Sequence, residues 1–242
     1  MEQIGFKCNR GVVRKNNEDA CFVIPSHDVY IVADGVGGNN SGEVASNTAV
    51  EEIAEFVRAN NLKACETPED IFTFFTRAID VANKRIFDKG NASPETRGMA
   101  TTMVLAHLKD DSVYIANVGD SRAYLFRNDR LKRVTKDHTY VNELIDKGYI
   151  TKDEAETHKK KNVITKALGA DRYVEPDFYK VDLRKGDIIL LCSDGLYGEV
   201  EEGTIAGVLA VTDKMNDAAA RLVDEAIKAG GRDNITVVCI KN

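Results

Sequence analysis

The sequence predicts an α+β fold, an antiparallel β-sandwich with its sheets inside and pairs of helices outside. Two observations lead to this prediction: short apolar runs have the length and composition of strands, and helical stripes come in consecutive pairs. Along the chain, strands are followed by two helices, a cluster of strands, two more helices and a final strand. Regular βαβ alternation, which would indicate a doubly wound parallel sheet, is absent from this order.

The predicted strands are seven apolar runs rich in β-branched and aromatic residues, which favour the strand conformation. The pieces KDD at 109–111 and RNDR at 127–130 lie between such runs and are typical of hairpin turns. The runs cover residues 21–24, 29–33, 102–108, 113–118, 123–126, 188–192 and 236–240.

Four segments carry apolar residues at helical spacing: 44–58, the stretch from Pro68 to near Gly90, and roughly 201–211 and 217–229. Residues 140–161 differ from these, because they are polar, helix-prone and rich in Lys and Glu. We interpret them as an insertion packed on the surface. No internal repeat or low-complexity linker divides the chain, so residues 1–242 are expected to form a single domain.

Composition excludes several classes of protein. The net charge of −6 and the pI of about 5.4 argue against a broad basic face for nucleic acid. No apolar run of 18 residues is present, so a membrane span is not expected. The start MEQIGFKCNRG does not resemble a signal peptide, and a cytoplasmic location is therefore expected. The five cysteines form no CxxC pair, which favours reduced thiols over a disulfide framework or a zinc site.

Acidic residues recur at the edges of the predicted strands, in most cases close to glycine. Each alone fits ordinary turn chemistry, and an acidic scaffold protein with Asp-Gly turns is one alternative. Several acids delivered to one point would repel one another unless cations separated them. Carboxylate oxygens without His or Cys suit Mg²⁺ or Mn²⁺ better than zinc. The five acids are Glu18, Asp34, Asp120, Asp194 and Asp233.

Glycines surround the first of these aspartates in VYIVADGVGGNNSGE, at 29–43. Asp34 ends an apolar strand and is followed by Gly35, Gly37 and Gly38. Because glycine lets other groups approach the backbone closely, we expect this loop to leave room for metal, water and phosphate beside Asp34.

Eight short motifs occur in the order seen in one known family. They are RKNNED, VADGVGGNNSGEVAS, GMATTMV, ANVGDSRAYL, TKDHT, NVITKALG, LLCSDGL and GGRDNITVV. From about Gly5 to Val238 the chain therefore resembles the metal-dependent Ser/Thr protein phosphatases of the PPM (type 2C) family. The form DGVGGNNSGEVAS looks most like the compact bacterial members, which oppose Ser/Thr kinases.

The resemblance implies a four-layer αββα sandwich with a binuclear Mn²⁺ or Mg²⁺ centre at one end of the sheets. Asp34 would bridge the two metals. The Gly35 carbonyl and Glu18 would bind one of them, and Asp194 and Asp233 the other. The reaction would be hydrolysis of phosphoserine and phosphothreonine in proteins by a metal-activated water.

Further roles follow from the same resemblance. Asp120 together with Asp194 would form an additional, third metal position, and Arg14 would hold the substrate phosphate. Residues 140–161 match the mobile flap of the family. The expected partners are phosphorylated proteins, a Ser/Thr kinase and its substrates, with no nucleic acid and no membrane, and the chain is expected to be a monomer.

The chain departs from the family pattern at three positions, and one of them leaves the source of the leaving-group proton open. Val36 stands where animal members carry a histidine thought to act as general acid, so the proton could come from metal-activated water or from an acid such as Asp19. Asn9 and Ala100 replace an aspartate and a glycine of two motifs. The alternative function is that of a non-catalytic relative that binds phosphoproteins or regulates a kinase. Such relatives usually lose metal ligands, whereas the five acids and Arg14 are all present here.

Overall fold

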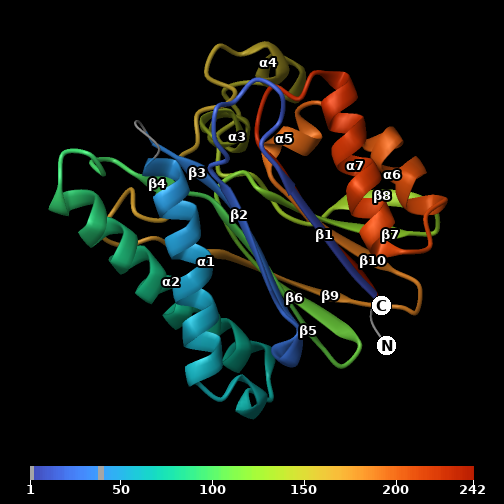
Figure 1. The fold of residues 1–242 in the computed structure, drawn as a ribbon, viewed down its shortest axis with the longest axis horizontal. Helices are drawn as coiled ribbons and strands as arrows, with labels where there is room; N and C mark the ends of the chain where they lie inside the picture. Colours follow the sequence, from blue (N-terminus) through green and yellow to red (C-terminus); the bar gives the residue numbers. More distant parts are fainter. Residues whose placement is uncertain (1–2, 38–40) are drawn as a thin grey trace.

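The computed structural model describes residues 3–37 and 41–242, and its core is a pair of antiparallel sheets (Figure 1). Every strand pair within them is antiparallel, which confirms the predicted sheet type. The first sheet has the order β1 (Gln3–Asn9), β11 (Ile235–Lys241), β10 (Ile188–Cys192), β7 (Arg122–Arg127) and β8 (Arg130–Arg133).

The second sheet contains the apolar run that begins VYIVADGVGGNNSGE. Its order is β2 (Asp19–Ile24), β3 (Val29–Val36), β5 (Met103–Lys109), β6 (Ser112–Val118) and β9 (Asp177–Asp182), with the short β4 (Ala100–Thr101) paired to β3. The first and last strands lie side by side, because Gln3 pairs with Lys241 across β1 and β11 (Figure 1).

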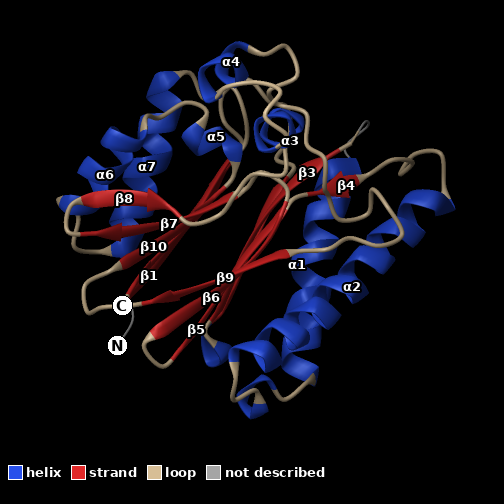
Figure 2. Ribbon diagram, turned by 180° about the vertical axis from the view of Figure 1, so that it is seen from behind, coloured by secondary structure: helices blue, strands red, loops and turns tan. Residues whose placement is uncertain are grey.

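Helices cover the outer face of each sheet (Figure 2). The helices α1 (Ser41–Ala59) and α2 (Pro68–Ala92) lie on the second sheet, and α6 (Glu202–Ala210) and α7 (Met215–Ala229) lie on the first. The remaining helical segments are short: η1 (Pro25–His27), η2 (Leu62–Ala64), α3 (Tyr140–Asp146), α4 (Lys152–Thr157) and α5 (Asp194–Tyr197). The predicted α+β sandwich with helix pairs outside is confirmed.

The continuous apolar runs are explained by burial on both faces. Along β3, Ile31 and Ala33 pack toward α1 and α2, whereas Tyr30 and Val32 pack between the two sheets. Successive strand residues point to opposite faces, so a strand covered on both sides needs no polar alternation. The two predicted hairpin turns are also confirmed. In them Asp110 and Asp129 adopt the left-handed backbone conformation that such turns require.

Four strands were not predicted: β1, β4, β8 and β9. The buried β4 has only two residues. The other three lie at sheet edges and are largely exposed or half-buried, so their sequences lack the apolar runs that mark the central strands. The polar segment at 140–161 contains α3 and α4, each started by a threonine N-cap, Thr139 and Thr151. Within the described residues, no helix has the length and apolar character needed to cross a membrane.

Candidate metal centre

The five acids predicted from the sequence lie at one end of the sandwich, the upper end in Figure 1. Asp34 belongs to the last part of β3, whereas Asp120 and Asp194 follow the ends of β6 and β10. Asp233 precedes β11 and Glu18 precedes β2, which both start from that end. Antiparallel pairing therefore gathers residues that are as far as 215 positions apart in the sequence (Glu18 to Asp233).

Asp34 is the most crowded of these acids. Burial, followed by the charges of Asp19, Asp194, Asp120 and Asp233, raises the pKa of Asp34 well above its usual range. A hydrogen bond links its carboxyl group to that of Asp194, whose own pKa is raised by burial and by Asp233. Like charges this close resist ionisation together unless cations compensate them. The electrostatics of the cluster thus favour binding of cations.

The backbone of Asp34 is fixed by two threonines. Its N–H donates to Thr102 Oγ1 at 3.1 Å, and its carbonyl accepts from the Thr102 N–H at 2.8 Å and from Thr101 Oγ1 at 2.9 Å. The Thr102 hydroxyl also lies 2.6 Å from Ser121 Oγ, beside Asp120. The two strand ends that deliver Asp34 and Asp120 are therefore tied together through the Thr102 hydroxyl.

A glycine in the first turn of α1 makes room for two of the predicted donors. A Cβ at Gly42 would lie 2.8 Å from the Gly35 carbonyl oxygen and 2.9 Å from the Glu18 carboxyl carbon. Both groups therefore face the same small space, as expected if Gly35 and Glu18 bind one ion. All donors at this end are oxygens, which suits Mg²⁺ or Mn²⁺. Gly38, which was expected to help leave room beside Asp34, lies outside the described residues.

The fit to a metal ion rests on this donor chemistry and crowding. Among the described residues, no three His, Cys, Asp or Glu side chains already stand at ligand spacing around a single point. Burial, and after it the charges of the neighbouring aspartates, raises the pKa of Asp34, and a bound cation would offset both effects. The residues present fit a binuclear centre by donor type, by their shared end of the sheets and by the space at Gly42.

Arg14 lies beside the cluster with its guanidinium half exposed. Its Nη2 donates to Asp233 Oδ2 at 2.7 Å, with 49% of the Arg14 side chain accessible to solvent. Asn234 shapes this loop: its Oδ1 accepts from the Glu18 N–H at 2.7 Å, and its Nδ2 donates to the carbonyls of Arg10 and Asn16. The sequence analysis did not single out Asn234, although it belongs to the motif GGRDN.

Asp19 lies deeper than the other acids and is 5% exposed. Its Oδ2 accepts from Ser193 Oγ at 2.7 Å, and Ser193 Oγ in turn accepts from the Thr236 N–H at 3.0 Å. Its Oδ1 has no hydrogen-bond partner. Burial and the charges of Asp194 and Asp233 raise the pKa of Asp19 to about 7. Asp19 thus links the two sheets directly behind Asp34, its partner across β2 and β3.

Asp120 is held from the side of α5. The Tyr197 hydroxyl donates to the Asp120 carbonyl at 2.9 Å, and the Tyr197 ring lies 3.4 Å from the guanidinium carbon of Arg122. Arg122 also makes a two-pronged ion pair with Asp137, with a shortest contact of 2.7 Å. Burial and Asp194 raise the pKa of Asp120 to about 7.

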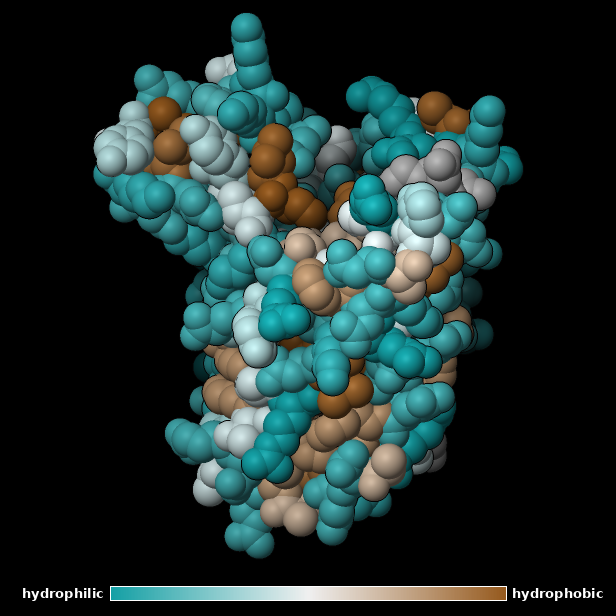
Figure 3. All heavy atoms as spheres, turned by 90° about the vertical axis from the view of Figure 1, so that its left-hand side faces the viewer, coloured by the Kyte–Doolittle hydropathy of each residue, from teal (hydrophilic) through white to brown (hydrophobic). Residues whose placement is uncertain are grey.

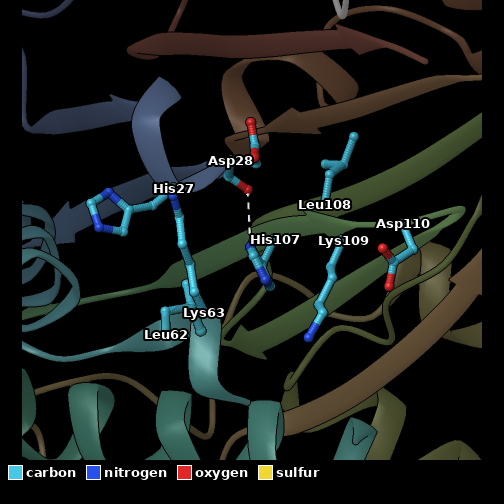
Figure 4. A pocket seen from close by; sticks show the side chains of 8 residues that line it. All are labelled: His27, Asp28, Leu62, Lys63, His107, Leu108, Lys109 and Asp110. Carbon is cyan, nitrogen blue, oxygen red and sulfur yellow. Dashed lines mark hydrogen bonds between the residues drawn. The ribbon is translucent and has the colours of Figure 1, made fainter. Parts of the chain in front are cut away.

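A separate cavity of about 260 Å³ lies at the opposite end of the second sheet (Figure 4). There the Asp28 carbonyl lies 3.2 Å from His107 Nδ1, and the side chains of Lys63 and Lys109 border the space. None of its lining residues belongs to the acid cluster. The side of the molecule seen in Figure 3 is mostly hydrophilic and is hollowed at its upper end.

A family model described as protein phosphatase 2C matches residues 12–229. The chain belongs to this family. It is 38% identical over 239 residues to the serine/threonine phosphatase stp of Listeria innocua, covering 98% of this chain and 94% of the relative. It is 35% identical over 232 residues to the serine/threonine protein phosphatase PstP of Mycobacterium tuberculosis, covering 96% of this chain and 43% of the relative.

Solved structures of other protein phosphatase 2C members share the fold. The phosphatase Stp1 from Staphylococcus aureus superposes with a TM-score of 0.91 at 33% identity, covering all of this chain and 95% of that one. The catalytic domain of PstP in complex with two manganese ions gives 0.86 at 32% identity, covering 99% and 97%. The prediction of a serine/threonine protein phosphatase of the PPM family is confirmed.

Proposed function

We propose that this protein phosphatase 2C member hydrolyses phosphoserine and phosphothreonine in proteins at a binuclear Mn²⁺ or Mg²⁺ centre held by its acid cluster. Asp34 would bridge the two ions, Glu18 and the Gly35 carbonyl would hold one of them, and Asp194 and Asp233 would hold the other. The observation that carries this assignment is the crowding of Asp34 by three further aspartates of the cluster in an all-oxygen environment. The manganese-containing PstP structure supports the choice and number of ions.

When bound, two such cations lower the pKa of a shared water toward neutrality and polarise the phosphoryl oxygens. The chain's own residues orient the reactants. Thr101 and Thr102 fix the Asp34 backbone, so the bridging carboxylate approaches from one direction. The Arg14 guanidinium, half exposed beside Asp233, can receive two phosphoryl oxygens through parallel hydrogen bonds. Its charge then offsets the negative charge on the transferring group.

A third, weaker position at Asp120 and Asp194 is part of the proposal. After burial, the charge of Asp194 is the largest cause that raises the pKa of Asp120, and both aspartates also raise the pKa of Asp34. A further cation between Asp120 and Asp194 would relieve this repulsion. Two protein carboxylates leave most of an octahedral shell to water, and such a position should be the least tightly occupied.

The proton for the leaving group has two candidate sources. Asp19 has a pKa of about 7, a suitable value for proton transfer near neutral pH. Its 5% exposure and its bond from Ser193 mean that a proton from Asp19 would reach the substrate only through water. Water activated at the centre is the alternative donor.

The proposed substrates are phosphoproteins. The phosphatase would act on them in the cytoplasm as a monomer and would oppose a Ser/Thr kinase. The segment at 140–161 is proposed as a flap that contacts the protein substrate. Its helices α3 and α4 lie at the same end of the molecule as the acids (Figure 1). Its base is closed by backbone hydrogen bonds from Tyr140 to Val163 and from Thr165 to His138, both 2.8 Å.

Hydrolysis of a phosphothreonine peptide and of p-nitrophenyl phosphate tests the proposal, with Mn²⁺ added and with chelator in its place. Activity should depend on Mn²⁺ or Mg²⁺ and disappear with chelator, because oxygen donors bind these ions reversibly. Full turnover by a preparation shown to be metal-free would overturn the two-metal assignment. Binding of the phosphopeptide without turnover under all metal conditions would instead indicate a non-catalytic phosphoprotein-binding protein.

A further inference from the structure

The Gly119–Asp120 turn carries a proposed metal ligand but has little side-chain bulk to hold it. Gly119 has a φ of +101°, and a Cβ there would lie 2.7 Å from the Thr102 side chain. Only glycine tolerates both conditions. The turn must therefore be held in place by hydrogen bonds to its backbone.

His138 supplies bonds to both backbone groups of Gly119. Its own N–H donates to the Gly119 carbonyl at 3.0 Å, and its ring Nδ1 accepts from the Gly119 N–H at 3.0 Å. The carbonyl has a second donor, Asn117 Nδ2, at 3.2 Å. No other acceptor for the Gly119 N–H is found among the described residues. Loss of the His138 side chain would therefore leave the Gly119 N–H without its hydrogen bond.

The ring of His138 is oriented for this role. Because Nδ1 accepts a hydrogen bond, the neutral ring carries its proton on Nε2, which lies 3.2 Å from Asp177 Oδ2. Burial lowers the pKa of His138, although Asp177 opposes this, so the ring is neutral at physiological pH. We therefore do not regard the His138–Asp177 contact as an ion pair. Asp177 is itself paired with Lys166 at 3.3 Å.

We propose that His138 is a positioning residue that holds the Gly119–Asp120 turn so that the Asp120 carboxylate faces Asp194. The Tyr197 hydroxyl holds the carbonyl of Asp120, and His138 holds the residue before it. The inference rests on the proposed function, because it concerns the use of Asp120 at the metal centre. It gives the histidine of TKDHT a role through Asp120 and not through direct contact with substrate.

Two amide replacements separate this role from simple packing. In His138→Asn the side-chain oxygen can occupy nearly the place of Nδ1 and accept from the Gly119 N–H. In His138→Gln the oxygen lies one methylene farther out, near the place of Nε2, and leaves that N–H without an acceptor. A buried N–H without a partner is unfavourable enough to move a glycine turn. A packing role would favour Gln, which has the volume closer to that of histidine.

The experiment measures kcat and KM for p-nitrophenyl phosphate at saturating Mn²⁺, Mn²⁺ binding by calorimetry, and the Gly119 amide proton shift by NMR in the metal-free protein. His138→Asn should keep kcat within about threefold and the amide shift near that of the original chain. His138→Gln should lower kcat about tenfold with KM little changed, and move the Gly119 amide upfield. The two tightest Mn²⁺ binding events should persist in both variants.

The proposal is overturned if His138→Gln keeps kcat and the amide shift, if both variants lose activity equally, or if the tightest Mn²⁺ binding is lost. Thermal unfolding of each variant identifies any loss of fold. A failure of the proposed function itself is distinguishable, since the original chain would then show no metal-dependent turnover at all.

Discussion

The two ends of the sandwich use aspartate in opposite ways. At the end away from the acid cluster, Asp28, Asp110 and Asp129 have φ values of 52°, 53° and 57° and serve as turn residues. At the other end, Asp34 and Asp120 have ordinary backbone conformations, and burial, followed by the charges of neighbouring aspartates, raises the pKa of each. Turn chemistry explains the first set completely. It leaves the second set unexplained, which is why those acids indicate a ligand site.

Charge compensation shows the same contrast. Asp187, at the turn-forming end, is buried, but Arg127 binds it with contacts of 2.5 and 2.9 Å. Burial alone would raise the pKa of Asp187, and the bonds from Arg127 and the Arg184 N–H lower it instead. At the acid end, Arg14 makes an ion pair with one acid of the cluster, Asp233, and the Arg14 side chain is half exposed. Where the protein supplies a cation the carboxylate ionises easily, and where it does not, a cation from solution is needed.

The largest expected effect comes from removing charge at one end and not at the other. Asp34→Asn should lower kcat at least about 100-fold, because a neutral amide is a poor bridge between two cations. The matched change Asp110→Asn should leave kcat within about twofold, since asparagine tolerates the same left-handed turn. Steady-state kinetics with p-nitrophenyl phosphate check both. A kcat above about a tenth of the original in Asp34→Asn, a barrier change under about 1.4 kcal/mol, would remove Asp34 from the bridging position.

Arg14 should be next in size. Arg14→Ala should raise KM for phosphate esters about tenfold, and Arg14→Lys should restore only part of this, because a point charge makes no bidentate contact. Arg130→Ala, an exposed arginine in the β7–β8 hairpin, is the control and should change neither constant. If Arg14 and Arg130 variants behave alike, the phosphate contact does not exist.

A methyl group at Gly42 should disturb one ion selectively. Gly42→Ala puts a Cβ within 2.9 Å of both the Gly35 carbonyl oxygen and the Glu18 carboxyl carbon, so Mn²⁺ affinity should fall about tenfold. The control is Gly207→Ala in α6, where nothing lies within 4 Å of the new Cβ. That change should leave Mn²⁺ binding alone and stabilise the helix by about 1 kcal/mol. Calorimetric titration with equal affinities in the two variants would contradict the shared site of Gly35 and Glu18.

The smallest effect concerns the pH dependence of stability in chelator. Asp19 and Asp120 have folded-state pKa values of about 7, above the unfolded value of about 3.9. Their contribution is therefore full below about pH 4 and is lost as the pH rises through about 7. Asp187, with its lowered pKa, acts in the other direction and loses its contribution as the pH falls below about 4.

Thermal unfolding of the metal-free protein between pH 4 and pH 8 checks this. Asp120→Asn should flatten the decline of Tm toward pH 8, and added Mn²⁺ should reverse it. If the decline of Tm with pH in Asp120→Asn equals that of the original chain, ionisation of Asp120 does not destabilise the metal-free protein.

Local pattern was enough for much of the fold and for the acids. The run at 29–33 predicts a strand, and the structure shows it buried on both faces. All five acids lie near the point where such a run ends or begins, and Asp34, Asp120 and Asp194 are directly adjacent to a glycine. The edge strands β1, β8 and β9 were missed because half-exposed strands carry few apolar residues.

The residues that hold the acids in place belong to the shared motifs GMATTMV, TKDHT and GGRDNITVV, but their hydrogen-bond partners were not predictable from the sequence. Asn234 receives the Glu18 N–H across 216 positions, and Thr102 joins Asp34 to Ser121 from a different strand. His138 bonds to Gly119 over 19 positions. Their partners become known only when the sheets are assembled. Function-bearing acids were visible because their charge is unusual at a strand end, whereas neutral supporting groups are common everywhere.

The most direct test of the account is anomalous diffraction at the manganese edge from crystals of the protein grown with Mn²⁺. Two strong peaks are expected at the acid end, with the Asp34 carboxylate between them. One peak should be bound by Glu18 and the Gly35 carbonyl and the other by Asp194 and Asp233, with any weaker third peak beside Asp120. Strong peaks elsewhere, or two peaks that Asp34 does not touch, would contradict the central claim that the uncompensated aspartates of this end are there to hold metal.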